Sequence, residues 1–178
     1  MFKVNHKNFL ILIVLLGIFI LSGIQWTTVQ SPLKVSVLDI GQGDSILIQT
    51  PEFKNILIDA GPDSAVVDRL GEELSFFDKT IDLFILTHPD MDHIGGALDI
   101  LSKMKVKQIM LTGVVGNSQI YKTFLDEVKR QATPLIIPTA NRDLRIGPDL
   151  VLDIVYPLPG QSFLGKEVKS ANNTSVVT

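Results

Sequence analysis

Four side chains of the types that bind metal ions stand within six residues of one another near the middle of the chain. Residues 87–96 read Thr-His-Pro-Asp-Met-Asp-His-Ile-Gly-Gly, and the candidate ligands are His88, Asp90, Asp92 and His93. Two imidazoles and two carboxylates make a mixed nitrogen and oxygen set, which suits Zn²⁺, Mn²⁺ or Fe²⁺. The residue types and their spacing therefore predict a metal site.

The spacing favours two ions. Pro89 disfavours a helical conformation at His88, so the chain turns there. Side chains at alternate positions of an extended turn point the same way, which lets His88 and Asp90 converge on one ion. The adjacent Asp92 and His93 can then reach a second ion. A pair of divalent ions, here Zn²⁺ or Mn²⁺, readies water for hydrolysis, and we assign Asp92 as the catalytic residue that orients this water.

A simpler interpretation of these residues is a surface hydrogen bond between a histidine and an aspartate, beside a solvated Asp-x-Asp turn. Four candidate ligands in six residues, in a chain with only three histidines, favour the metal site over this alternative. The absence of cysteine excludes disulfides and thiolate ligands.

The predicted elements place this cluster at the end of a buried strand. Residues 81–87 are mostly apolar and come directly before the candidate ligands. Period-2 alternation, apolar runs and turn residues predict the other strands, and 3.6-residue periodicity predicts the helices. We expect a hairpin turn at residues 41–44 and helices over 63–77, 97–103 and 119–131. The buried face of the first helix is expected to carry Val66, Val67, Leu70, Leu74 and Phe77. Further strands are expected over 34–40, 45–49, 55–59, 106–111, 134–138, 142–146 and 150–156. This order predicts an α/β fold with mixed sheets.

The motif resembles the signature of the metallo-β-lactamase superfamily, His-x-His-x-Asp-His. His88, Asp92 and His93 match it, whereas Asp90 stands where the second histidine is expected. This variant resembles the extracellular hydrolase domain of ComEC-type DNA-uptake proteins and their free-standing relatives. Residues 38–45 and 56–61 resemble the opening strands of the same domain.

The resemblance implies an αββα sandwich of two similar halves, with the metal ions at the edge where the halves join. Residues 34–178 correspond to the first half and to the start of the next strand at residues 172–177, so we expect a partial sequence that lacks further ligands and is inactive alone. Asp59 ends a strand and is expected to support a ligating histidine through a hydrogen bond. Asp44 is expected at the rim of the site, although an aspartate in an ordinary hairpin turn explains it equally well.

The resemblance also implies cleavage of phosphodiester bonds, with single-stranded DNA as a possible substrate. Charge does not favour this partner. Sixteen basic and nineteen acidic residues give a net charge of −3, and without Lys3 and Lys7 the rest of the chain carries −5, the reverse of a typical DNA-binding protein. The alternatives are a β-lactamase-like amide or ester hydrolase, which Asp90 disfavours, and a membrane-tethered binding module without catalytic activity. No protein partner can be inferred.

The N-terminal segment predicts a membrane anchor. Residues 9–26 form an apolar run that would be about 27 Å long as a helix, close to the hydrocarbon thickness of a bilayer. Lys3 and Lys7 precede it, so residues 1–8 are expected in the cytoplasm and the domain outside. Residues 27–33 are predicted to be a linker. The alternative is secretion after cleavage of a signal peptide.

Overall fold

The computed structural model describes residues 6–26, 31–140, 143–148 and 150–178, with the backbone alone for residues 6, 8 and 20–26. Contacts divide the chain into two compact units, Met1–Pro32 and Leu33–Thr178. Most of the linker predicted for residues 27–33 and the start of the strand predicted for 142–146 fall outside the described residues.

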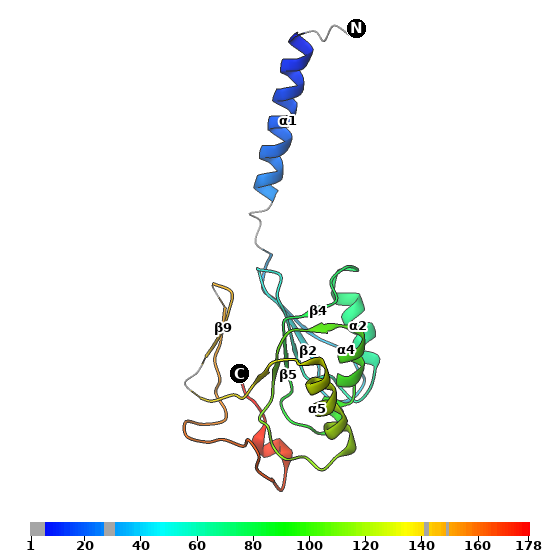
Figure 1. The fold of residues 1–178 in the computed structure, drawn as a ribbon, viewed down its shortest axis with the longest axis vertical. Coiled ribbons are helices and arrows are strands. Elements are labelled where there is room, and N and C mark those ends of the chain that lie inside the picture. The colour runs from blue at the N-terminus through cyan, green and yellow to red at the C-terminus, as the bar shows by residue number, and fades with distance from the viewer. Residues whose placement is uncertain (1–5, 27–30, 141–142, 149) are drawn as a thin grey trace. The chain divides into compact units, whose positions relative to one another are not determined.

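The described residues of the first unit include the helix α1 (His6–Trp26; Figure 1). Its large apolar side chains between Phe9 and Phe19 are all more than half exposed. Within the part of the chain that is described, however, no helix combines the length and the apolar character needed to cross a membrane. The membrane-spanning helix predicted for residues 9–26 is therefore not supported.

A six-stranded mixed sheet forms the centre of the second unit. In spatial order it contains β1 (Lys34–Val37), β2 (Ile46–Gln49), β3 (Asn55–Ile58), β5 (Leu83–Ile85), β7 (Ile109–Met110) and β8 (Leu135–Ile136). The first three strands are antiparallel, and from β3 to β8 the pairing is parallel. Parallel neighbours need a long crossover between them, and helical segments supply it.

Three helices cover one face of this sheet, namely α2 (Ala65–Glu73), α4 (Ala97–Lys103) and α5 (Gln119–Gln131) (Figure 1). Phe84 of β5 and Phe124 of α5 are both fully buried and meet edge to face, with ring centroids 6.2 Å apart. Burial on both faces explains why the central strands are continuously apolar in sequence.

A smaller layer covers the opposite face of the sheet. The hairpin of β9 (Leu144–Ile146) and β10 (Leu150–Leu152) packs its apolar side chains against Ile56, Ile85 and Met110. A short 3₁₀ helix, η1 (Ala171–Thr174), precedes Val176, which joins the same cluster. The mixed α/β architecture expected from the sequence is confirmed.

Two of the predicted strands are divided in the structure. The segment predicted as a strand over 81–87 forms β4 (Thr80–Ile81) and β5, and the one predicted over 106–111 forms β6 (Lys105–Val106) and β7. β4 and β6 pair with each other in a separate two-stranded sheet. Asp82 lies at the break, where its carboxylate accepts hydrogen bonds from the backbone N–H of Asn55 and from Lys107.

The predictions for one helix and for the C-terminal strand were wrong in their extent. The helix expected to reach Phe77 ends at Glu73, because Leu74 is already extended (ψ 154°), and Phe77 is 93% exposed rather than buried. At the C-terminus, the strand predicted over residues 172–177 is replaced by η1 and a single antiparallel bridge between Tyr156 and Val177.

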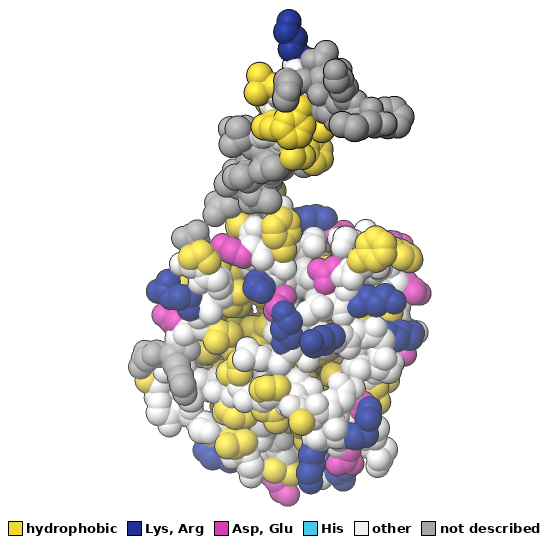
Figure 2. Space-filling model, turned by 45° about the horizontal axis from the view of Figure 1, so that its top comes forward, with side chains coloured by type: hydrophobic (Ala, Val, Ile, Leu, Met, Phe, Trp, Pro, Cys, Tyr) yellow, Lys and Arg dark blue, Asp and Glu magenta, His cyan; other side chains and the backbone are white. Residues whose placement is uncertain are grey.

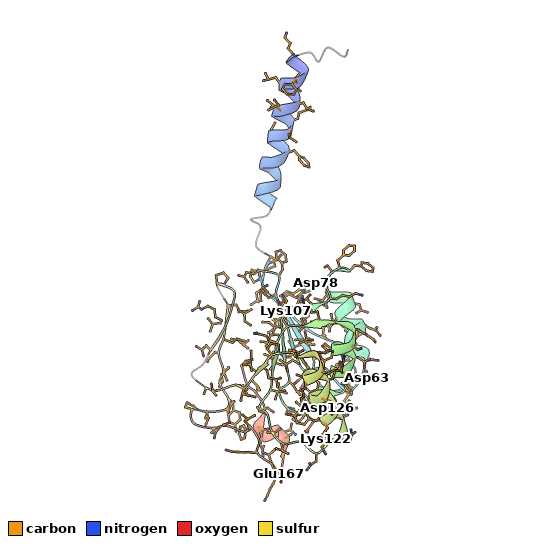
Figure 3. The ribbon with its side chains drawn as sticks, viewed as in Figure 1. Asp63, Asp78, Lys107, Lys122, Asp126 and Glu167 are labelled. Atoms are coloured by element: carbon orange, nitrogen blue, oxygen red, sulfur yellow. The ribbon has the colours of Figure 1, made fainter. Side chains whose placement is uncertain are left out.

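The parallel strands give the domain two distinct ends. Asp78 and Lys107, which precede β4 and β7, lie at the end where these strands begin, and Glu167 and Lys122 lie at the other end (Figure 3). The candidate metal ligands follow β5, so they lie where the parallel strands finish, the edge at which open α/β sheets commonly carry their sites.

Gly95 provides a test of how tightly this end is packed. A Cβ atom at Gly95 would lie 1.9 Å from the carbonyl oxygen of Pro62, whereas one at Gly71 in α2 would meet nothing within 4 Å. We expect Gly95→Ala to lower the free energy of unfolding by about 2 kcal/mol or more through overpacking. Gly71→Ala should raise it by up to about 1 kcal/mol through helix propensity. Urea unfolding of both variants checks this, and equal stabilities would contradict the packing described here.

Candidate metal centre

The loop after β5 and the short helix α3 (Met91–Ile94) carry all four candidate ligands. Asp90 has an extended backbone (φ −79°, ψ 152°), and its carbonyl accepts hydrogen bonds from the N–H groups of His93 and Ile94. His88 and Asp90 therefore lie on the loop, while Asp92 and His93 lie in the first turn of α3.

Backbone contacts from two neighbouring turns fix α3 in place. The N–H of Asp44 donates to the carbonyl of Asp92 over 3.3 Å, and the N–H of Ala60 donates to the carbonyl of His93 over 2.7 Å. Gly43 has φ +80°, and a Cβ there would lie 2.0 Å from the Asp92 carbonyl oxygen, so only glycine permits this approach. The structure thus places Asp44 beside the site through its backbone, and its charge is one of those that act on His93.

Asp59 connects the strand ends to the candidate ligands. Its side chain is buried, and its backbone has φ +57°, a strained conformation for a residue other than glycine. Its Oδ1 accepts from the N–H of Thr87 over 2.8 Å, and its Oδ2 accepts from the hydroxyl of Thr87 over 2.6 Å. Nδ1 of His93 lies 2.8 Å from the same Oδ2.

The contact with Asp59 determines the tautomer of His93. A carboxylate can only accept a hydrogen bond, so Nδ1 of His93 carries the proton and the lone pair of Nε2 is left open. Nε2 lies 3.9 Å from Oδ1 of Asp92. The hydrogen bond to Asp59 also raises the pKa of His93 above its ordinary value, against the opposing effect of burial.

Thr87 determines the tautomer of His88 in a similar way. The hydroxyl of Thr87 donates its one proton to Asp59, so it accepts a hydrogen bond from Nδ1 of His88, 2.9 Å away. Nε2 of His88 then presents its lone pair 3.6 Å from Oδ2 of Asp90. Burial, followed by the nearby His93, lowers the pKa of His88, which favours the neutral form that a metal ligand requires.

The four predicted residues therefore come together as two pairs, each with one imidazole nitrogen and one carboxylate oxygen. The rings of His88 and His93 are neighbours, with centroids 3.9 Å apart. Two ligands of a tetrahedral zinc ion lie about 3.4 Å apart, so the separations of 3.6 and 3.9 Å within the pairs fit two positions of a coordination shell. The donor types also suit Zn²⁺ or Mn²⁺.

A complete shell is not formed by these side chains. Among the described residues, no group of three or more His, Cys, Asp or Glu side chains is arranged to hold a metal ion. Each of the two expected pairs supplies two ligands, where tight sites use three or four.

Sequence reasoning missed three polar residues in contact with this loop, Thr87, Asn172 and Ser175. Thr87 adjoins the candidate ligand His88, and its hydroxyl could have identified it in the sequence as a hydrogen-bond partner of that histidine. Asn172 and Ser175 lie more than eighty residues away in the chain, and no local pattern connects them with the loop.

Asp59→Asn tests the electrostatic part of this arrangement. We expect the pKa of His93 to fall in the variant, because the partner that raises it loses its charge. A raised histidine pKa stabilises the folded metal-free chain below about pH 6.5, and this contribution is lost as the pH rises through the folded-state value. The stability difference between wild type and variant should therefore narrow with rising pH.

The measurement is the NMR titration of His93, together with urea unfolding at several pH values. Asp99→Asn, which alters a surface pair with Lys103, is the matched control and should leave His93 unchanged. An unaltered His93 pKa in Asp59→Asn would contradict the contact.

Comparison with known proteins adds independent information. The sequence profile of the Metallo-beta-lactamase superfamily matches residues 38–162. ComE operon protein 3 of Bacillus subtilis (strain 168) is 35% identical over 95 residues, which cover 44% of this chain and 12% of that protein. The chain thus spans about an eighth of the length of this relative.

Solved structures that match part of the chain include a metallo-β-lactamase of Cronobacter sakazakii with a HARLDQ motif, at 21% identity and a TM-score of 0.43, covering 64% of this chain and 46% of that one. A diphosphatase from the PhnP family has 19% identity and a TM-score of 0.38, covering 60% and 40%. The superfamily generally binds divalent metal ions, usually zinc. With the superfamily's profile matching well over half of the sequence, the chain belongs to the metallo-β-lactamase superfamily.

Proposed function

We propose that this chain forms the metal-binding part of a metal-dependent hydrolase that cleaves phosphodiester bonds, with single-stranded DNA as a candidate substrate. One observation carries the proposal. Two neighbouring imidazoles each keep Nδ1 protonated by a fixed acceptor and present Nε2 beside a carboxylate. This is the arrangement of a histidine prepared as a metal ligand.

In this proposal His88 and Asp90 hold one divalent ion, Zn²⁺ or Mn²⁺, and Asp92 and His93 hold the other. Such ions supply Lewis acidity and a lowered pKa of water. Asp92 is nearly half exposed, so it is accessible to solvent and can accept a proton from an attacking water molecule. Asp59 is inaccessible to substrate and serves to hold His93.

The choice of a phosphodiester substrate rests on the relationship to ComE operon protein 3 and on Asp90. The resemblance of the His-x-Asp-x-Asp-His variant to ComEC-type hydrolase domains supports this class over amides and esters. An extracytoplasmic location stays a prediction from residues 1–26.

Surface charge supports a local contact with phosphate rather than a long DNA-binding track. On the face that Figure 2 presents, basic and acidic side chains are interspersed, and the net charge of the chain is negative. A bound metal ion is a large local positive charge and can attract a phosphate without a basic surface. We therefore expect weak, metal-dependent substrate binding.

A binding module without catalytic activity is the second candidate, and one observation favours it. The described side chains provide two ligands for each ion, not three. A domain with this deficiency could retain the fold and bind a ligand without turning it over.

Metal titration tests the proposed ligand pairs directly. We expect the chain to bind Mn²⁺ or Zn²⁺ weakly at His88 and His93, because each pair leaves most of a coordination shell to water. NMR line broadening by Mn²⁺ would locate the ion, and the double variant His88→Ala/His93→Ala should abolish the effect. Nanomolar binding of two ions would contradict the description of two incomplete pairs.

The reaction is tested by an assay of the longest natural form of the protein with Mn²⁺ or Zn²⁺. We expect hydrolysis of bis(p-nitrophenyl) phosphate and single-stranded DNA, and no hydrolysis of a β-lactam. Asp92→Ala and His93→Ala should each reduce the rate roughly 10²-fold or more, whereas Asp99→Ala, on the surface of α4, should not.

Three other outcomes of this assay would change the proposal. Activity that survives both site variants would exclude the site proposed here. Hydrolysis of the β-lactam in preference to the phosphodiesters would replace the substrate class. Binding of the phosphodiester with no turnover would favour the binding module.

A further inference from the structure

Residues 172–176 lie directly against the loop that carries His88 and Asp90. The N–H of Val176 donates to the carbonyl of Thr87 over 3.0 Å. The side chain of Asn172 reaches Asp90 over 3.2 Å, and the side chain of Ser175 reaches His88 over 3.3 Å. Residues 172–176 thus contact both members of the first ligand pair.

The hydrogen bonds of Ser175 determine what it does to His88. Its hydroxyl donates to the carbonyl of Asn172 over 2.8 Å, so toward Nδ1 of His88 it can only accept. The hydroxyl of Thr87 is committed in the same way. Two hydroxyl oxygens therefore share the Nδ1 proton of His88, and together they favour the tautomer that leaves Nε2 free.

Asn172 acts on the other member of the pair. Its amide nitrogen is a donor and contacts Oδ2 of Asp90, the oxygen that faces Nε2 of His88. The Asp90 side chain is 42% exposed, and a carboxylate exposed to this degree would otherwise rotate freely. The amide contact restricts its orientation toward the imidazole.

The segment is itself firmly attached to the domain. Thr174 and Val176 are buried, and Val176 packs in the apolar cluster under the sheet. The hydroxyl of Thr174 donates to the carbonyl of Ala171, and the hydroxyl of Tyr156 donates to the carbonyl of Asn173. Asn172 and Ser175 therefore project from a fixed support rather than from a free end.

We propose that Asn172 and Ser175 are positioning residues that hold His88 and Asp90 in the arrangement required by the first metal ion. The inference rests on the proposed function, because it gives these residues a role toward the metal pair. They do not contact the ion; they act through its two ligands.

The first test uses the metal-free chain and therefore does not depend on the proposed function. ¹⁵N NMR of His88 reports which ring nitrogen carries the proton. The wild type should show a protonated Nδ1, and Ser175→Ala should shift the population toward protonated Nε2. Ser175→Thr, which keeps the hydroxyl, should restore the wild-type spectrum, and Ser170→Ala, a serine just before the same segment, should not change it.

The second test is the affinity for Mn²⁺, measured by line broadening at His88. We expect Asn172→Ala and Ser175→Ala each to weaken binding about tenfold, the lower end of the range for residues that support metal ligands. Asn173→Ala is the matched control for Asn172, since Asn173 contacts Tyr156 through its backbone carbonyl alone. Asn173→Ala and Ser170→Ala should both bind Mn²⁺ as the wild type does.

The two tests separate the possible failures. If the wild-type chain bound no Mn²⁺ at His88, the proposed function would lose its site, and the tautomer measurement alone would decide the contact with Ser175. If Asn172→Ala and Ser175→Ala matched their controls in both measurements, the positioning role would be wrong. Equal losses in the variants and the controls would also overturn it, because they would indicate a general loss of structure.

Discussion

The buried carboxylate of Asp59 is the interaction on which the rest of the site depends. A charge buried in this way is costly unless it is hydrogen-bonded, and here Thr87 and His93 together supply three donors. The carboxylate thereby joins the end of β3 to the end of β5 and to α3. It also fixes the proton positions of both histidines, directly in His93 and through Thr87 in His88. One buried acid thus specifies the tautomers of two histidines.

Close backbone packing provides the precision that this network needs. Gly43 lets the turn after β1 approach α3, and Gly95 lets α3 approach the turn after β3. These contacts position α3 from two sides, so the site is built between strand ends rather than on a free loop. Catalytic or binding groups held on rigid elements keep their geometry better than groups on loops.

The sequence predicted the parts of the structure that depend on local patterns. The helices α4 and α5 have the predicted bounds. Their apolar residues lie at helical spacing, and Ile100 of α4 and Phe124 and Val128 of α5 are buried. The prediction of a continuous strand over residues 81–87 was wrong because Asp82, a polar residue in an apolar run, makes hydrogen bonds that interrupt it. Phe77 was assigned to a buried face by periodicity alone, and the helix ends before reaching it.

In the site, too, the features that were predicted are those with a local sequence pattern. The candidate ligands were recognised by type and spacing, and their metal-binding roles stay predictions. The contacts that Asn172 and Ser175 make with Asp90 and His88 could not be predicted. These contacts join segments that are far apart in the chain and have no periodic or compositional relationship.

The contacts between residues 88–90 and residues 172–175 also bear on the order in which the domain is assembled. They close a loop of more than eighty residues, and the entropy lost on closing a loop increases with its length. The helices and parallel strands that bury Phe84 and Phe124 are complete by β8, well before residue 172 leaves the ribosome. We therefore expect the scaffold to fold first and the side chains of His88 and Asp90 to become ordered last, so that a nascent chain acquires its shape before this part of the loop takes its final arrangement.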